Sequence, residues 1–302
     1  MRVVVTCDAI AGLGARRASE VVARAFSDAG AQVAVAVLGA GGASLADAVA
    51  PFPGVAVIRP ESATELGARL AELAREGGRG ARYVIDLATT EVTDLGATFL
   101  DAFPGPPVEA LASARAGLAN VELVAVVAAD EVERPLTGLS GLASTVGREV
   151  GHDLRQVLAA DARAEAWLAT LGVADRPGAG AAGGLGLLLQ HVGAAIMDGL
   201  TLTADLLNLA ETMRRADLVV TGARSLDFHA IGGPVVKRIA AMGEEALRPV
   251  VAVAGRNFVS ARELRLAGIE SAAALVPAGS PDEPTEQDLA RVARQLAATW
   301  TW

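Results

Sequence analysis

The sequence predicts an α/β fold, in which a parallel-sheet outer domain built from both ends of the chain carries a second α/β domain as an insertion. Three observations lead to this prediction. Short aliphatic runs alternate with helical patterns at the start of the chain, the same alternation returns at its end, and strands are sparser in the middle. Strands that alternate with helices form a parallel sheet, because each helix carries the chain back to the same edge.

At the beginning of the chain, three predicted strands alternate with helical patterns. A strand is expected at residues 2–6 (RVVVT), followed by the turn CDAIAG and by a helical pattern over residues 16–29 that Gly30 ends. A second strand at residues 32–38 leads through the glycine-rich turn GAGGAS into a helix capped by Ser44. A third, short strand is expected at residues 55–58.

The end of the chain repeats the pattern. Strands are predicted at residues 218–221, 249–254 and 271–276, helices at 233–242 and 260–267, and a closing amphipathic helix at 286–299. We therefore expect a flavodoxin-like or Rossmann-like outer domain of residues 1–60 and 215–302, with residues 61–214 inserted. Ligands of such folds bind where strands end, so a site in a cleft between the two domains is expected.

Composition excludes several classes of function. The net charge of −9 and the pI of about 5.0 argue against nucleic-acid binding, which needs a basic surface. No run of about 18 apolar residues predicts a membrane span, and the N-terminus does not resemble a signal peptide. Cys7 is the only cysteine, which rules out an intrachain disulfide and favours a cytoplasmic location.

Polar residues at strand ends are the candidates for chemistry. Asp227, in the segment TGARSLDFHAIGG, is positioned to accept a hydroxyl proton or hold Mg²⁺, or simply to cap the next helix. Arg224 and His229 in the same segment could bind phosphate or carboxylate groups, or be solvated. Asp8 after the first strand and Asp94 in TTEVTDLG could likewise be catalytic or could simply cap the helix that follows. No spacing of His, Asp and Glu predicts a metal site.

The densest glycine cluster is GAGAAGGLG, residues 178–186. A glycine-rich loop before a helix can cradle an anion with its backbone N–H groups, or it can let two segments pack closely. The cluster matches neither the P-loop pattern nor a GxGxxG after a strand.

Together these stretches resemble the first family of bacterial glycerate kinases, over nearly the whole chain. GAGAAGGLG is similar to the family's G-x-G-A-A-G-G-L-G. VELVAVVAADEVERPL resembles a strand ending in Cys-Asp-Val-x-Asn-Pro-Leu, with Asp130, Pro135 and Leu136 in place. The stretches ADLVVTG, VVAVAG and ARELRLAGIESAAALVP also follow the family, as does the pair Leu226-Asp227.

The departures fall on the loops at strand ends. Pro234 and Ala11 stand where the family has lysines, while Asp8, Gly12, Gly222, Asp227 and Gly233 remain. Ala223 and Arg224 replace Glu-Gly, and His229 and Ala230 replace Gln-Thr. The loop GAGGAS lacks both carboxylates of the family's Asp-Gly-Gly-Glu-Gly-Thr. ATTEVTDLG keeps only Asp94 and Gly96 of its counterpart.

The resemblance implies phosphorylation of glycerate or a related small hydroxy acid by Mg²⁺ and ATP, with Asp227, Asp8 and Asp94 as catalytic residues. The substrate and phosphate would be bound by Gly12, Gly41, Gly42, Asp130, Gly183, Gly184, Gly222, Arg224, His229 and Gly233. No residue is assigned as a metal ligand.

The losses leave alternatives open. Losing one electrostatic partner of the transferred phosphate typically costs about 10²–10³ in rate, so a catalytically impaired homologue that acts as a ligand-binding or assembly subunit is the main alternative. A different enzyme that uses His229 is another. Arg16, Arg17, Arg224 or Arg256 could replace the lysines. The terminal Trp300 and Trp302 either cover the last helix or form the contact of a homodimer.

Overall fold

The computed structural model describes residues 1–77, 80–90 and 92–301. The chain divides into two compact units. Unit 1 consists of Met1–Ala40 and Leu200–Trp302, and unit 2 consists of Gly41–Gly199. Each unit has its own sheet, and every pair of neighbouring strands in both sheets is parallel.

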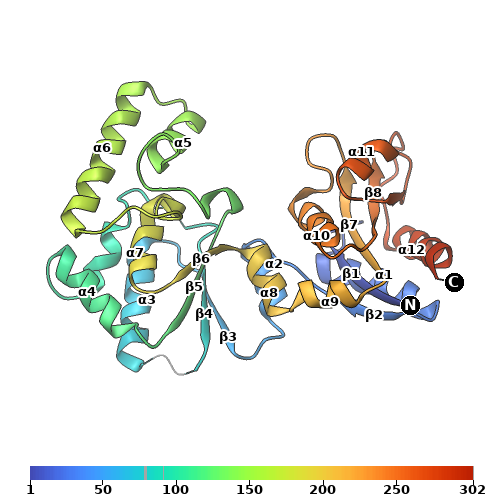
Figure 1. Ribbon diagram of the computed structural model, residues 1–302, viewed down its shortest axis with the longest axis horizontal. Helices are drawn as coiled ribbons and strands as arrows, with labels where there is room; N and C mark the ends of the chain where they lie inside the picture. Colours follow the sequence, from blue (N-terminus) through green and yellow to red (C-terminus); the bar gives the residue numbers. More distant parts are fainter. Residues whose placement is uncertain (78–79, 91, 302) are drawn as a thin grey trace. The chain divides into compact units, whose positions relative to one another are not determined.

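Unit 1 contains a five-stranded sheet with the order β2-β1-β7-β8-β9 (Figure 1). Its strands are β1 (Arg2–Cys7), β2 (Gln32–Val35), β7 (Leu218–Leu226), β8 (Val250–Asn257) and β9 (Ser271–Ala274). β1 pairs directly with β7 although more than 200 residues separate them in sequence. The predicted fold class, a parallel sheet built from both ends of the chain, is therefore confirmed.

Helices bury both faces of this sheet. They are α1 (Ala15–Asp28), α8 (Gly199–Leu206), α9 (Leu209–Arg215), α10 (Gly233–Glu245), α11 (Ala261–Leu266) and α12 (Glu286–Trp300). Val3 and Val5 pack in the cluster formed with α1 and α12, whereas Val4 between them packs with α9 and α10. Successive side chains of a strand point to opposite faces, so a strand that is covered on both sides must be apolar throughout. Trp300 packs partly buried against the first cluster, and Trp302 lies outside the described residues.

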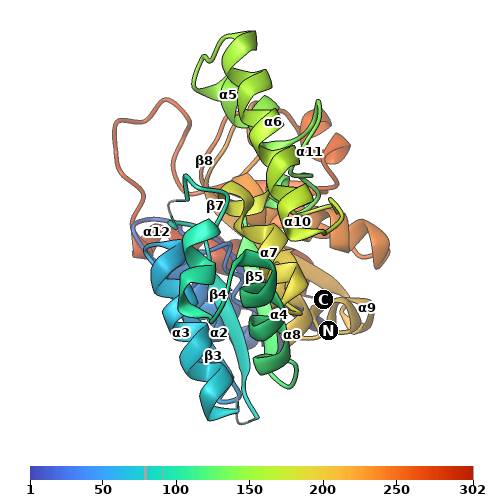
Figure 2. The same ribbon diagram turned by 90° about the vertical axis from the view of Figure 1, so that its left-hand side faces the viewer.

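Unit 2 contains a four-stranded sheet with the order β3-β4-β5-β6. The strands are β3 (Val55–Ile58), β4 (Arg82–Asp86), β5 (Glu122–Val127) and β6 (Ala195–Asp198). The helices are α2 (Gly42–Val49), α3 (Ala63–Glu76), α4 (Pro107–Gly117), α5 (Leu142–Glu149), α6 (Leu154–Leu171) and α7 (Leu185–His191). Short 3₁₀ helices are η1 (Ala97–Ala102), η2 (Ala129–Glu131) and η3 (Ala181–Gly184). Both views show α5 and α6 as a helical pair beyond one end of the sheet (Figures 1 and 2).

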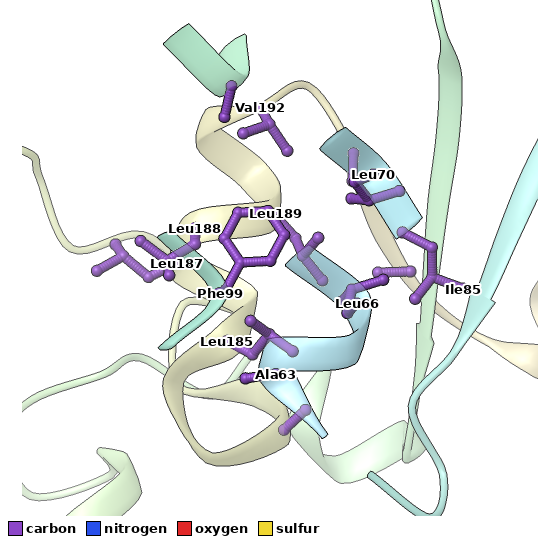
Figure 3. Close-up of a cluster of buried hydrophobic side chains, with 14 of the residues drawn as sticks. Ala63, Leu66, Leu70, Ile85, Phe99, Leu185, Leu187, Leu188, Leu189 and Val192 are labelled. Atoms are coloured by element: carbon purple, nitrogen blue, oxygen red, sulfur yellow. The ribbon is translucent and has the colours of Figure 1, made fainter. Parts of the chain in front are cut away.

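One large core holds unit 2 together. Phe99 of η1 is fully buried, and its ring lies between Leu66 of α3 and Leu185 and Leu188 of α7 (Figure 3). Ile85 of β4 joins the same cluster, which fastens these helices to one face of the sheet. Burying a side chain of this size contributes roughly 1.5–3 kcal/mol. The strands that precede the loops after β4 and β5 are therefore part of a tightly packed core.

The division between the units differs in position from the predicted one. Residues 41–60 belong to unit 2, since β3 pairs with β4 in register and not with any strand of the first sheet. Residues 200–214 belong to unit 1, because α9 packs on the same cluster as β1 and α10. A short aliphatic strand does not reveal in its sequence which sheet it joins. Among the described residues, none of the helices has the length and apolar character needed to cross a membrane.

Candidate functional site

A cavity of about 680 Å³ lies in unit 2, beside the segments that follow β4 and β5. Residues of the segments 87–90 and 92–95 form one wall, and α5, α6 and the turn before α6 contribute another. Its polar lining consists of Thr90, Thr93, Asp94, Glu131, His152 and Arg163. Small-molecule sites usually have volumes of about 300–1,000 Å³ and combine apolar walls with a few polar groups. This cavity has that size and character, and it lies where parallel sheets bind ligands.

Asp94 holds the loop at the cavity wall. One carboxyl oxygen accepts the N–H of Gly96 at 3.0 Å, and the other accepts the N–H of Thr98 at 2.8 Å, so the side chain holds the turn that leads into η1. Partial burial would raise the pKa of Asp94, but the hydrogen bonds from Thr98 and Gly96 outweigh burial and hold the pKa below its usual value. Gly96 is the N-cap residue of η1, so Asp94 supports the first turn of η1 from two residues earlier and is not the N-cap that the sequence left open as an alternative.

Replacing Asp94 by alanine is expected to lower the free energy of unfolding at pH 7 by about 1 kcal/mol, because its hydrogen bonds with the N–H groups of Gly96 and Thr98 are lost. The lowered pKa means that this contribution is complete above the ordinary Asp pKa of about 4 and is lost as the pH falls through the folded-state pKa. Urea unfolding from pH 7 to pH 3 measures the effect. Asp101→Ala, at an exposed position of η1, is the control. A difference between Asp94→Ala and the native protein that does not shrink in acid would contradict this role.

Asp86, at the end of β4, organises the glycine-rich loop of residues 39–44. It is buried, with 2% of its surface exposed, and accepts the N–H of Gly42 at 2.7 Å and that of Ala88 at 3.2 Å. A side chain at Gly41 would place its Cβ 2.8 Å from the Cβ of Ala88, so the loop lies close against the segment after β4 and a larger residue would force one of them to shift. Asp86 was not among the predicted site residues, although an aspartate that ends an aliphatic run was the available signal.

Asp130 belongs to a charged group around Arg134. Arg134 is buried, with 8% of its surface exposed, and donates to Asp130 at 2.6 Å and to Glu131 at 2.7 Å. The second oxygen of Glu131 accepts the N–H of Ala182 at 3.2 Å. Asp130 itself is mostly exposed. The group ties the segment after β5 to the glycine cluster, and Glu131 brings a carboxylate to the cavity.

The glycine cluster of residues 178–186 allows backbone segments to pack closely. A Cβ at Gly183 would lie 2.6 Å from the backbone oxygen of Val92, and one at Gly180 would press on the backbone oxygen of Pro135. Ala182, Gly183 and Gly184 all have positive φ angles, which glycine adopts readily and alanine does not. The close-packing interpretation therefore accounts for these glycines. Gly183 also lines the cavity, and a role of Gly183 and Gly184 in anion binding stays a prediction.

In unit 1, Asp8 follows the end of β1. Its backbone N–H donates to the carbonyl of Gly222 at 2.8 Å, and its carboxylate accepts the N–H of Ala9 at 2.7 Å. Gly12 closes the next turn with a φ of 74°. Gly222 lies inside β7, where a Cβ would be 2.5 Å from the carbonyl oxygen of Val253. β7 thus continues to Leu226, beyond the predicted end at residue 221, and Gly222 serves strand packing.

Asp227 follows the end of β7 and shapes the turn before α10. One carboxyl oxygen accepts the N–H groups of Ala230 at 2.9 Å and His229 at 3.1 Å. The Ala230 hydrogen bond, with that of His229, holds the pKa of Asp227 below its usual value. Cys7 faces Gly222 in the sheet, so Asp227 lies four residues beyond the position opposite Asp8. At about 3.3 Å per residue, the two backbones are about 13 Å apart along the strands.

Gly233, another predicted binding residue, has a φ of 81° and begins α10.

The model of the glycerate kinase family matches residues 84–301, which is most of the chain. The chain belongs to the glycerate kinase family. An uncharacterised protein of Mycobacterium bovis is 35% identical over 68% of this chain and 53% of its own length. A glycerate kinase of Halalkalibacterium halodurans is 31% identical over 61% of this chain and 51% of its own length. These matches span about half of the length of each curated relative.

A crystal structure from Salmonella typhimurium LT2, of a protein named as a candidate glycerate kinase 2, has the same fold. It aligns with a TM-score of 0.70 over 99% of this chain and 98% of its own, at 19% sequence identity. The likeness covers both units, so the two chains share the same fold throughout.

The arginines that could replace the family's lysines have different surroundings. Arg17 pairs with Glu286 at 2.7 Å, and Arg256 donates to the carbonyl of Asp282 at 2.7 Å. Arg224 carries an exposed side chain on β7. Pro234 lies in the first turn of α10, and Lys237, the only lysine, is exposed one turn further on. Within the described residues, no group of three or more His, Cys, Asp or Glu side chains lies together in a way that could hold a metal ion.

Proposed function

We propose that the protein binds a small hydroxy acid and a nucleotide, and that it transfers phosphate from Mg-ATP to glycerate weakly or not at all. The observation that carries this proposal is the turn at Asp227. The residue expected to accept the proton of the substrate hydroxyl uses one carboxyl oxygen for two backbone N–H groups. Its lowered pKa also makes it a weaker base, since a general base works best with a pKa near the working pH.

The missing lysines support the same proposal. Phosphoryl transfer depends on cations that offset the charge developing on the phosphoryl oxygens. Alanine with a φ of 54° occupies position 11, and proline occupies position 234. Lys237 is three residues beyond Pro234, so it shares a helix face with it but lies one turn away. Any nucleotide bound here would meet less positive charge than in family members that retain both lysines.

The cavity of unit 2 supports the binding part of the proposal. Its apolar walls, with Arg163 and His152 on α6 and the turn before it, suit a small organic acid. The use of Mg²⁺ and ATP stays a prediction. A ligand at 100 times its dissociation constant stabilises a protein by about 2.7 kcal/mol. Thermal unfolding with glycerate and ATP, with and without Mg²⁺, should therefore show a stabilisation that Arg163→Gln reduces.

The turnover number for glycerate phosphorylation is expected to lie well below about 1 s⁻¹, which is the low end of ordinary enzyme rates. A coupled assay of ADP release with glycerate and Mg-ATP measures it. Asp227→Asn should change the rate little, as should the control Asp28→Asn at the exposed end of α1. Turnover of about 1 s⁻¹ or more that disappears in Asp227→Asn alone would contradict the proposal. It would favour the alternative of an active kinase in which arginines such as Arg224 replace the lysines.

A further inference from the structure

Two adjoining cavities lie in unit 2 where α4 and α7 end, and they share no lining residue with the cavity beside β4 and β5. The first has a volume of about 340 Å³ and is lined by Arg115, Arg176 and His191. The second has a volume of about 430 Å³ and shares Arg115 and His191 with the first. Two guanidinium groups, from a helix and a loop, and the imidazole of a second helix therefore meet at one place.

No acidic side chain in the described lining of the two cavities balances the charge of the arginines. Among the described residues, no aspartate or glutamate lines either cavity, and Arg115 and Arg176 form no ion pair. This is unusual in a chain with a net charge of −9, in which many arginines are paired. Basic residues near helix ends can stabilise the helix dipole, which accounts for Arg115 and His191. It does not account for Arg176, which lies on the loop before the glycine cluster.

Hydrogen bonds position the end of α7 and the loop before the glycine cluster. The side-chain amide of Gln190 donates to the carbonyl of Pro177 at 2.6 Å, so the end of α7 is tied to the loop that carries Arg176. Nδ1 of His191 lies 2.8 Å from the carbonyl oxygen of Leu187. A carbonyl oxygen only accepts, so Nδ1 carries the proton and Nε2 is left for another partner. These bonds position the imidazole of His191 and the backbone of the loop, while the side chains of Arg115 and Arg176 are exposed.

The second cavity adds an apolar wall. Val108, Ala112 and Ala116 recur every four residues along α4 and line it together with Val173. Residues at this spacing lie on one face of a helix, and 51% of Val108 is exposed. The apolar face continues directly into Arg115 and His191, so a charged end and an apolar end lie next to each other.

We propose that these cavities bind an organic anion with a short apolar tail. Its carboxylate or phosphate would be held by Arg115 and Arg176 beside His191, whose Nε2 donates to the anion only when the ring is protonated, and its tail would lie on the apolar face of α4. Guanidinium groups are well suited to both anions, and the tail supplies the contact that inorganic phosphate alone lacks. This binding is independent of any phosphoryl transfer by the protein.

Titration with hexanoate and with hexyl phosphate tests the proposal, with 1-hexanol as the neutral probe. The chain has three histidines, and each reports on a different place. His191 lies at the proposed site, His152 at the larger cavity of unit 2 and His229 in the turn of unit 1. NMR of the histidine rings should show a shift of His191 with both anions and none with 1-hexanol. A shift at His152 or His229 with no shift at His191, or no binding of either anion, would overturn the proposal.

Variants provide a second test by calorimetry. Arg115→Gln combined with Arg176→Gln should weaken hexanoate binding by about tenfold or more, since two charge-assisted contacts are lost. Arg155→Gln, at an exposed position of α6 that lines neither cavity, should leave it unchanged. Both substituted arginines are exposed, so the double variant should unfold at the same urea concentration as the native protein. Equal affinity in the folded double variant, or equal affinity for hexanoate and 1-hexanol, would overturn the proposal.

Discussion

Replacing Gly180 by alanine is expected to destabilise the protein by about 3 kcal/mol, the upper end of ordinary overpacking. Gly180 has a φ of −80°, which alanine adopts without strain, so backbone conformation contributes nothing to the effect. The cost arises because the added Cβ would press on the carbonyl oxygen of Pro135, with the carbonyl oxygen of Arg134 only 3.2 Å away. Backbone atoms cannot rotate aside, and the N–H of Gly180 also donates to Arg134 at 2.9 Å.

Urea unfolding followed by circular dichroism measures this effect, and Gly54→Ala is the matched control. Gly54 also lies in unit 2, and a Cβ there would meet no atom within 4 Å. The control should be neutral or slightly stabilising, because alanine restricts the unfolded chain. If Gly180→Ala were as stable as Gly54→Ala, the glycine cluster would not be needed for packing, and an anion-binding role would become the better explanation.

Arg134→Met is expected to lower the free energy of unfolding by about 3 kcal/mol. Removing one partner of a buried ion pair leaves the other charge without compensation, and such losses reach about 3–5 kcal/mol. The lower value fits here because Glu131 is partly exposed and keeps its hydrogen bond with Ala182. Methionine preserves most of the side-chain length, so the effect measures the loss of charge more than the loss of volume.

Asp130→Asn separates the two halves of this charged group. Asp130 is 71% exposed, and exposed ion pairs contribute about 0–1 kcal/mol, so its replacement should cost much less than that of Arg134. The comparison is made by urea unfolding at pH 7. Equal losses in the two variants would mean that Arg134 acts mainly through Asp130, and that its contact with Glu131 contributes little.

Local patterns predicted most elements of the fold but not every partner. The run of residues 55–58 was expected to be a strand, and it is one, but it pairs with β4 in the sheet of unit 2. The end of β7 was placed five residues too early, because Gly222 was read as ending the strand. Sheet membership depends on contacts between segments distant in sequence, and a glycine in a strand marks either a break or a close approach. Sequence periodicity alone does not distinguish these cases.

Only some residues of the candidate site could be predicted from the sequence, because tertiary packing brings the others to the cavity. Asp94 and Gly183 line the cavity of unit 2, and both were among the predicted residues. His152 and Arg163 were not, because α5 and α6 bring them to the cavity only through tertiary packing. Glu131 and Arg134 could have been recognised, since ADEVER places Arg134 three residues after Glu131 and four after Asp130. That spacing allows ion pairs along a helical turn, and both pairs form.

The pairing of β1 with β7 has a consequence for the nascent chain on the ribosome. Arg2 and Asp217, which are hydrogen-bonded at this pairing, are 215 residues apart. Translation adds about 5–20 residues per second, so β1 waits roughly 10–40 seconds for its neighbour to be synthesised. The continuous segment of unit 2 can complete its own sheet during this interval. Val4, which is buried against α9 and α10 in the finished sheet, has none of these contacts until then, which makes this segment an expected binding site for chaperones that recognise hydrophobic nascent chains.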